Sequence, residues 1–373
     1  MRTTRIDLPA AAPGTERHLL VHRLGRPGSS PKAYLQAAIH ADELPGVMVL
    51  RHLMPMLEAA EAEGRLRGEV VLVPMANPIG AAQGLMQSHL GRYDLVRMSN
   101  FNRGWPDFTA QLADRVAERL GDDAESNVAV IRAELRQLAE ELPAGDENRA
   151  LRRELCRLAV DADLVLDLHC DLEAAMHLYL GTPLWPGAAD LSAEIGAEAV
   201  MLDEASGGSP FDEVFSAPWW VMARRFPDRP IPLACLAATI EYRGIRDVED
   251  GLARGDAEVL LRFLVRRGVV DGAVQDLPIA RCEATPLTGA AMIEAPASGI
   301  VLFDVTPGEE VEAGQRVARL VDPLQRAEVA VATPVSGRVF ARSLRGFARA
   351  GDVIVKVAGR EPIAGRGGSL LPN

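Results

Sequence analysis

The sequence predicts an α/β protein with a mixed, largely parallel central sheet flanked by helices, and a small C-terminal β module with a barrel-like form. Three observations support this prediction. In the first half of the chain, short apolar runs alternate with longer segments of helical periodicity. Successive apolar runs lie far enough apart for a crossover helix, which neighbouring parallel strands require. Beyond about residue 286 the chain changes to short strands and turns, and this part contains an internal repeat.

The composition is that of a globular protein and excludes several classes of function. The chain has 373 residues, of which 48% are hydrophobic and 25% charged, and its net charge is −12. An acidic chain of this kind is a poor partner for nucleic acid or an anionic membrane surface, because both need a basic footprint. We find no apolar run of the ~18 residues that span a bilayer, and no apolar signal core near the N-terminus. Four scattered cysteines do not suggest a disulfide framework, so we expect a cytoplasmic protein.

The first strand–helix–strand unit is expected between residues 34 and 74. Residues 34–39 form a short, mostly apolar run that ends at His40. Residues 44–62 have apolar side chains at helical spacing, and Pro55 within them predicts a kink or an early end. Residues 69–74 are expected to form a second buried strand, parallel to the first.

The next segment, residues 108–160, is helical in character. Gly121 and residues 143–145 divide it into about three helices. It is expected to be a helical insertion within the larger part of the chain. A surface position and an arm or lid that contacts another subunit of a homo-oligomer are both compatible with the sequence.

Further strands and one more helix are expected before residue 270. The strand candidates are residues 163–168, 176–180, 199–202 and 233–241, and the helix candidate is 247–267. Trp219 and Trp220, close to Pro218, are expected in a long loop. There they could form a wall of a pocket or pack in the ordinary way.

The C-terminal part contains two similar β units. Residues 295–301 match residues 333–339, and each copy is followed by a turn and a glycine before a strand, Gly314 and Gly351 respectively. Two units in tandem suggest a small barrel-like sandwich with quasi-twofold symmetry. We therefore expect a larger part at residues 1–280 and this module at residues 286–360.

Candidate metal ligands follow two of the predicted strands. His40 and Glu43 lie directly after the first strand, and His169 ends the strand that begins at Asp163. The carboxyl ends of parallel strands meet at one edge of a sheet, where ligands bind. Two histidines and one glutamate are the protein ligands of many catalytic zinc sites, with the fourth position left to water. The alternative for the His40–Glu43 segment is a solvated loop before a helix.

Three more segments place polar side chains at turns or strand ends. Asp167 could hold His169 in one tautomer, or could bond only to the backbone. Asn102 and Arg103 offer an amide and a guanidinium that fit a carboxylate, or else form a structural turn. Glu241 ends a late apolar strand and suits a general base that takes a proton from an attacking water, or a salt-bridged strand end.

Together, and in this order, these segments resemble the aspartoacylase/succinylglutamate desuccinylase family of the zinc carboxypeptidase superfamily, over most of residues 30–250. The resemblance implies a zinc carboxypeptidase-like fold and one Zn²⁺ per chain. It implies the following roles: zinc ligands His40, Glu43 and His169; general base and later proton donor Glu241; substrate-carboxylate clamp Asn102 and Arg103.

The resemblance also implies an arginine that polarises the scissile carbonyl, for which Arg92 and Arg97 compete and Arg92 is preferred. Three residues depart from the family pattern, namely Ala41, Asn100 and Cys170 in place of its usual glycine, aspartate and small hydroxyl residue. None of these departures removes a ligand, but they indicate a divergent branch whose substrate is not given by the family name. We expect Cys170 to be a packed thiol.

The C-terminal module resembles the lipoyl and biotinyl carrier domains. A carrier presents its lysine on a hairpin, and the corresponding position here is Arg326, which cannot be acylated in that way. The single lysine of the module, Lys356, is expected on the last strand. We therefore expect the module to be structural.

Zinc-dependent hydrolysis of the amide bond of an N-acyl amino acid, a reaction of amino-acid metabolism, is the function that this sequence favours. The partner is then a small substrate that carries a carboxylate. Two alternatives remain open at this stage. One is a carboxypeptidase that acts on a peptide C-terminus by the same chemistry, and the other is a binding protein that has lost catalysis.

Overall fold

A nine-stranded sheet forms the centre of the protein, in the order β1-β2-β4-β3-β9-β13-β11-β12-β14. The computed structural model describes residues 1–367 and residue 370. The strands of this sheet are β1 (Arg2–Asp7), β2 (His18–Leu24), β3 (Lys32–Ala37), β4 (Glu69–Val73), β9 (Leu164–Asp171), β11 (His177–Gly181), β12 (Ala199–Asp203), β13 (Leu236–Gly244) and β14 (Ala284–Pro286).

The sheet is mixed and mostly parallel, as predicted. β3 pairs in parallel with β4 and β9, and β9 pairs in parallel with β13. β11 runs antiparallel to β13, and β1 and β2 add an antiparallel edge. All residues of β3 and β4 are buried, because helices cover both faces of the parallel strands.

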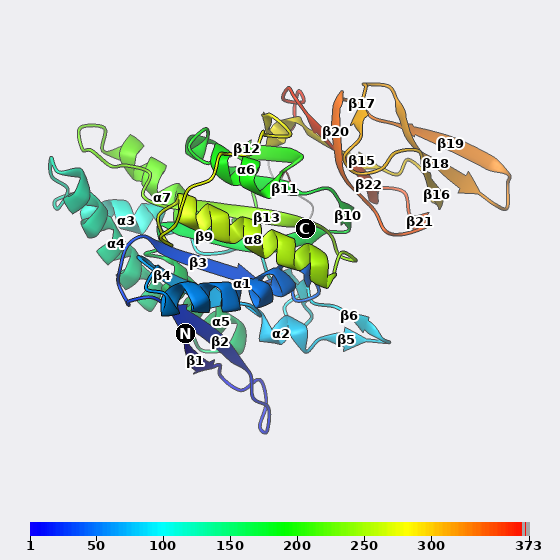
Figure 1. Ribbon diagram of the computed structural model, residues 1–373. Coiled ribbons are helices and arrows are strands. Elements are labelled where there is room, and N and C mark those ends of the chain that lie inside the picture. The colour runs from blue at the N-terminus through cyan, green and yellow to red at the C-terminus, as the bar shows by residue number, and fades with distance from the viewer. Residues whose placement is uncertain (368–369, 371–373) are drawn as a thin grey trace.

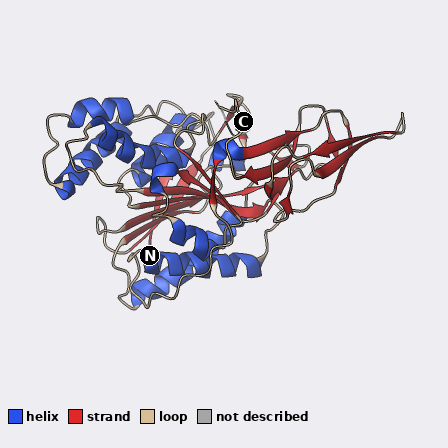
Figure 2. Ribbon diagram, turned by 90° about the horizontal axis from the view of Figure 1, so that it is seen from above, coloured by secondary structure: helices blue, strands red, loops and turns tan. Residues whose placement is uncertain are grey.

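One face of the sheet is covered by α1 (Pro45–Ala62), α6 (Ala189–Ile195) and α8 (Asp250–Arg266). In Figure 2 the strands lie between this group of helices and a second group. Helix α1 runs through Pro55 and ends at Ala62, so the expected early end at Pro55 is wrong. The Pro55 side chain is exposed, on the side of the helix that faces away from the sheet.

The opposite face is covered by α3 (Thr109–Val116), α4 (Ala124–Glu140), α5 (Glu147–Ala159) and α7 (Phe211–Arg225). The first three are the helices expected between residues 108 and 160. Asp123 and Asp146 begin α4 and α5, since each side chain accepts a hydrogen bond from a backbone N–H in the first turn. Their apolar side chains join the core on this face.

Trp219 and Trp220 lie on helix α7 and not in a loop, so this expectation is wrong. Both are almost fully buried, at 1% and 4% exposure. The ring of Trp220 packs over Gly181, where a Cβ atom would come within 2.5 Å of it. Their role is therefore ordinary packing.

The C-terminal module forms two small antiparallel sheets, drawn in yellow-orange to red in Figure 1. Its strands are β15 (Ala290–Glu294), β16 (Gly299–Phe303), β17 (Glu310–Val311), β18 (Arg316–Asp322), β19 (Ala327–Ala332), β20 (Gly337–Arg342), β21 (Phe347–Ala348) and β22 (Val353–Gly359). The short strand β10 (Glu173–Ala174), from the larger part of the chain, joins one of these sheets by pairing with β20. The two repeats correspond in structure, because β16 and β20 begin within them and the glycines Gly314 and Gly351 stand just before β18 and β22.

The remaining short elements connect these layers. They are α2 (Pro78–Ala81), β5 (Gly84–Leu85), β6 (Ser88–His89), β7 (Tyr93–Asp94), β8 (Ser99–Asn100), η1 (Thr182–Leu184) and η2 (Leu287–Gly289). Among the described residues, no helix combines the length and apolar character that a bilayer crossing requires.

Candidate active site

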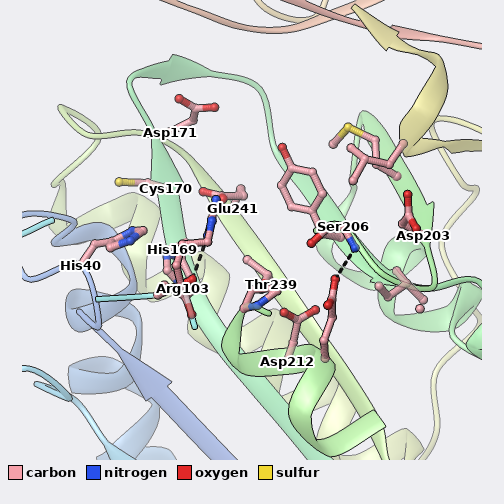
Figure 3. Close-up of a pocket in the computed structure, with 18 of the residues that line it drawn as sticks. His40, Arg103, His169, Cys170, Asp171, Asp203, Ser206, Asp212, Thr239 and Glu241 are labelled. Carbon is pink, nitrogen blue, oxygen red and sulfur yellow. Dashed lines mark hydrogen bonds between the residues drawn. The ribbon is translucent and has the colours of Figure 1, made fainter. Parts of the chain in front are cut away.

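The predicted ligands meet at one edge of the central sheet. His40 and Glu43 lie in the turn between β3 and α1, and His169 lies near the carboxyl end of β9. Glu241 lies on β13, directly opposite His169 in the strand pairing. Because β3, β9 and β13 are adjacent and parallel, their carboxyl ends form a common edge. Figure 3 shows His40, His169 and Glu241 gathered on one side of the pocket.

His40, Glu43 and His169 form a buried cluster that could hold one metal ion. The His40 Nδ1 atom lies 2.9 Å from Glu43 Oε1, and the His169 Nδ1 atom lies 2.8 Å from Glu43 Oε2. One ligand atom from each residue lies within 4.8 Å of the other two. The two imidazoles thus present the same nitrogen to one carboxylate.

The second nitrogen of each histidine is held by a polar side chain. His40 Nε2 lies 2.7 Å from Asn100 Oδ1, and His169 Nε2 lies 2.9 Å from Asp167 Oδ2. Both partners are acceptors, so each Nε2 can donate to its partner, and each Nδ1 would then offer its lone pair to a metal ion held together with Glu43. Without a metal ion, the Asp167 and Glu43 carboxylates beside His169 raise its pKa well above the ordinary value. Asn102 Nδ2 is also 3.2 Å from His169 Nε2, but the closer and charged Asp167 is the stronger partner.

This arrangement fits a metal ion. A ligating histidine usually donates its other N–H to an oxygen, which fixes its tautomer. Burial and the nearby Arg92 lower the pKa of His40 to about 4, which keeps the imidazole in the neutral form that binds metals. Two histidines and one carboxylate are a donor set typical of catalytic zinc.

A chain of hydrogen bonds continues from His169 into the core. Asp167 Oδ1 accepts a hydrogen bond of 3.0 Å from Gln36 Nε2, and Gln36 Oε1 accepts one of 2.7 Å from the Tyr34 hydroxyl. Tyr34, Gln36 and Asp167 are all fully buried. Of the two roles considered for Asp167, the structure therefore places its side chain against His169. Gln36 and Tyr34 were not singled out from the sequence, because both lie within the strand expected at residues 34–39 and not after its end.

Glu241 is half-buried beside the cluster, and one of its carboxylate oxygens is shielded from solvent. Its Oε2 atom makes no hydrogen bond within the described part of the chain. Burial raises the pKa of Glu241 to about 8, and the nearby carboxylates of Glu43 and Asp171 add to the rise. A carboxyl group whose pKa lies near neutrality suits proton transfer in both directions.

The backbone is strained on both sides of this edge. Ala38, two residues before His40, has φ of 58°, and Arg243, two residues after Glu241, has φ of 56°. Residues other than glycine adopt such values at a cost, and they cluster at functional sites.

Arg92 reaches the cluster and Arg97 does not. The Arg92 Nη1 atom lies 2.9 Å from Glu43 Oε1 and 3.2 Å from His40 Nδ1. Arg97 instead forms ion pairs with Asp94 and Asp146, so among the described residues its partners lie outside the pocket wall. Gly91 brings Arg92 close, since a Cβ atom there would lie 2.2 Å from the backbone nitrogen of Asp42.

Asn102 and Arg103 both line the pocket, but each also holds the fold. The Asn102 Oδ1 atom accepts hydrogen bonds from Trp105 Nε1 and from the Phe211 backbone N–H. The Arg103 Nη1 group donates to the Asn102 carbonyl oxygen at 2.8 Å. The Arg103 side chain extends over Gly208, where a Cβ atom would come within 2.5 Å of it.

The pocket is also lined by residues that the sequence did not indicate. They are one aromatic side chain and three acidic ones: Tyr179, Asp203, Asp212 and Glu213. Figure 3 shows Asp203 and Asp212 on the side away from His40. Lys356 of the C-terminal module also lines the pocket. Cys170 is buried at the pocket, and its backbone N–H donates to Glu43 Oε2 at 3.2 Å.

The fold and this site define a class of α/β proteins with a candidate metal centre at the carboxyl edge of a mixed sheet. The family model for the catalytic domain of succinylglutamate desuccinylase/aspartoacylase matches residues 29–221. The chain therefore belongs to the succinylglutamate desuccinylase/aspartoacylase family, as its sequence predicted, and the family is one of metal-dependent amidohydrolases.

Solved structures of similar proteins agree with this assignment. A succinylglutamate desuccinylase/aspartoacylase family protein of Shewanella amazonensis is 25% identical, with a TM-score of 0.85 over 96% of this chain and 98% of that chain. Its counterpart in Shewanella frigidimarina is 23% identical, with a TM-score of 0.84 over 96% and 97%.

A product-bound structure of the ectoine utilization protein EutE of Ruegeria pomeroyi is 16% identical, with a TM-score of 0.67 over 96% and 95%. Its similarity concerns the fold alone. None of the curated protein sequences compared with this chain matches it.

Proposed function

We propose that this protein hydrolyses the amide bond of an N-acyl amino acid, or of a related small amide that carries a carboxylate, and that it depends on one Zn²⁺. One observation carries the proposal. The buried cluster of His40, Glu43 and His169 opens on the same pocket as Glu241, whose Oε2 atom makes no hydrogen bond within the described residues.

His40, Glu43 and His169 would hold the zinc ion. When bound, zinc supplies a Lewis acid that polarises the amide carbonyl and lowers the pKa of water. His169 is oriented for this task by Asp167, and His40 by Asn100. Glu43 contributes the negative charge of the site.

Glu241 acts as the general base and then as the general acid. It takes a proton from the attacking water and later delivers it to the leaving nitrogen, so that an amine and a carboxylic acid are released. Arg92 donates a hydrogen bond to the carbonyl oxygen as negative charge develops on it. Its position beside Glu43 supports this role.

Asn102 and Arg103 bind a carboxylate of the substrate. The guanidinium of Arg103 is half-buried in the pocket, and its planar fork matches a carboxylate bidentately. The Asn102 Oδ1 atom already accepts hydrogen bonds from Trp105 and Phe211, so Asn102 would contact the carboxylate through its Nδ2 group.

The test is a panel of N-acetyl, N-succinyl and N-aspartyl amino acids, together with short peptides, assayed on zinc-loaded protein. We expect turnover of at least one N-acyl amino acid and of none of the peptides. His169→Ala should lose both bound zinc, by elemental analysis, and activity. Turnover of peptides alone would indicate a carboxypeptidase, and zinc binding without any turnover would indicate a binding protein. Stoichiometric zinc in His169→Ala would contradict the ligand assignment.

A further inference from the structure

The C-terminal module docks directly behind the strand that carries His169. β10, which follows β9, pairs antiparallel with β20 of the module. The Ala175 N–H donates to the Phe340 carbonyl oxygen at 3.0 Å, and the fully buried Phe340 ring lies 5.1 Å from the ring of His177. Figure 1 shows the module beside β10, β11 and β12. The contact surface thus begins within a few residues of the candidate metal centre.

Two basic residues of the module form ion pairs with this part of the catalytic sheet. Lys356, on β22, pairs with Asp171, and Arg342, on β20, pairs with Glu173 at 2.6 Å. The side chains of Lys356 and Asp171 are 17% and 12% exposed, whereas that of Glu173 is 41% exposed. Lys356 and Asp171 both line the pocket that holds the metal cluster. The two pairs are therefore alike in chemistry but differ in their relation to the site.

Asp171 ends β9 at the place where its pairing with β13 becomes irregular. His169 lies opposite Glu241, but Asp171 lies opposite Gly244, so β13 has a bulge between these two positions. A bulge leaves residues unpaired and disrupts the ladder locally. The strand ends that carry the ligand His169 and the base Glu241 are thus joined by an incomplete set of backbone hydrogen bonds.

The ion pair of Lys356 supplies a contact at this point. It reaches Asp171 from outside the sheet, two residues beyond His169. Cys170, between them, donates its backbone N–H to Glu43. A displacement of Asp171 would therefore change the positions of both His169 and Glu43.

We propose that Lys356 is a positioning residue of the active site, which holds the end of β9 through Asp171, so that the module completes the site and is more than a structural appendage. The kinetic part of this proposal, the effect on kcat, rests on the proposed function. Its metal-binding part stands independently, since the geometry of His169 and Glu43 governs metal affinity whatever the substrate is.

The experiment compares Lys356→Met with Arg342→Met, which breaks the ion pair with Glu173 at the same interface. Zinc affinity of the apoprotein, kcat, KM and Tm are measured for both. We expect Lys356→Met to weaken zinc affinity and to lower kcat by about tenfold each, with KM changed less. Arg342→Met should change both quantities less than about twofold. Lys356→Arg keeps the charge and should recover most of the loss.

A simple structural role predicts a different result. Equal losses in Lys356→Met and Arg342→Met, in proportion to their decreases in Tm, would overturn the proposal. If Lys356→Met does not fold, Asp171→Asn breaks the same pair from the other side with little change in volume, and the same comparison applies. If the wild type hydrolyses no amide, the proposed function fails, and the zinc affinities of the variants still decide whether Lys356 positions the metal site.

Discussion

The carboxyl edge of the central sheet and the C-terminal module differ in how they bury polar side chains. At the sheet edge, His40, Glu43 and His169 are at most 5% exposed and Asp167 is fully buried. In the described part of the module, the buried polar side chains are neutral hydroxyls, those of Thr333 and Ser343. Burying a charge is costly unless it is paired and hydrogen-bonded.

The difference shows which of the two regions buries polar groups for stability alone and which buries them for metal binding and catalysis. Thr333 satisfies its hydroxyl locally, by donating to the Val335 carbonyl oxygen at 2.8 Å. The polar groups of the sheet edge depend on partners from distant segments, such as His40 on Asn100 and Gln36 on Asp167. Substitutions at the edge should therefore affect metal binding and turnover, and substitutions in the module core should affect stability alone.

The largest effect is expected for Glu241→Gln, which removes the proton-transfer group and keeps the shape. The variant should bind zinc and substrate, but kcat should fall by roughly 10²–10⁴-fold. Thr333→Val is the matched control in the module, and its kcat should equal that of the wild type. Near-normal turnover of Glu241→Gln would show that another group, such as Asp42, takes the proton.

A smaller effect is expected for Gln36→Leu, which removes the hydrogen bond from Gln36 to Asp167 and leaves the metal ligands themselves unchanged. Asp167 then loses the partner that orients it toward His169, so zinc affinity should fall about 10- to 100-fold. Chelator competition on the apoprotein measures this affinity, with Thr333→Val again as the control. An unchanged affinity would mean that packing alone orients Asp167.

The smallest effect concerns stability and Asp212, a buried carboxyl that lines the pocket. Burial, with Glu213 and Asp167 nearby, raises the pKa of Asp212 to about 7, above its ordinary value of about 3.9. Between these two values the folded protein keeps a proton that the unfolded chain releases. The free energy of unfolding should therefore fall as pH rises from about 4 to 7 and change little from this group above 7.

Asp212→Asn cannot titrate and serves to isolate this contribution. From pH 5 to pH 8, its free energy of unfolding should improve relative to the wild type by at least about 1 kcal/mol, the equivalent of roughly one pKa unit. Urea denaturation at the two pH values gives the comparison. A constant difference between variant and wild type would place the pKa of Asp212 near its ordinary value.

The sequence predicted those parts of the site that depend on local pattern. His40, His169 and Glu241 stand out because each polar residue comes at the end of a buried apolar run, and parallel strands bring such ends together. The three helices between residues 109 and 159 follow from their periodicity and from the breaks at Gly121 and at residues 143–145.

The features that the sequence did not reveal depend on packing between distant segments. Lys356 meets Asp171 across 185 positions of the chain, and no local pattern marks that contact. Helix α7 was missed because Pro218 interrupts its pattern, although the helix is stabilised by the burial of Trp219 and Trp220. Gln36 looks like an ordinary polar residue within a strand until Tyr34 and Asp167 are placed beside it.

The sharing of β10 has a consequence for how the protein unfolds. β10 lies in the chain between β9 and β11 of the central sheet, but it pairs with β20 of the module. Ala199 and Met201 of the central sheet pack in one cluster with Phe340 and Ala358 of the module. Unfolding of the module alone would expose these apolar side chains to water and would remove the strand with which β10 pairs. The two parts should accordingly lose their structure in one cooperative transition, and neither is a unit that evolution could exchange without redesigning the other.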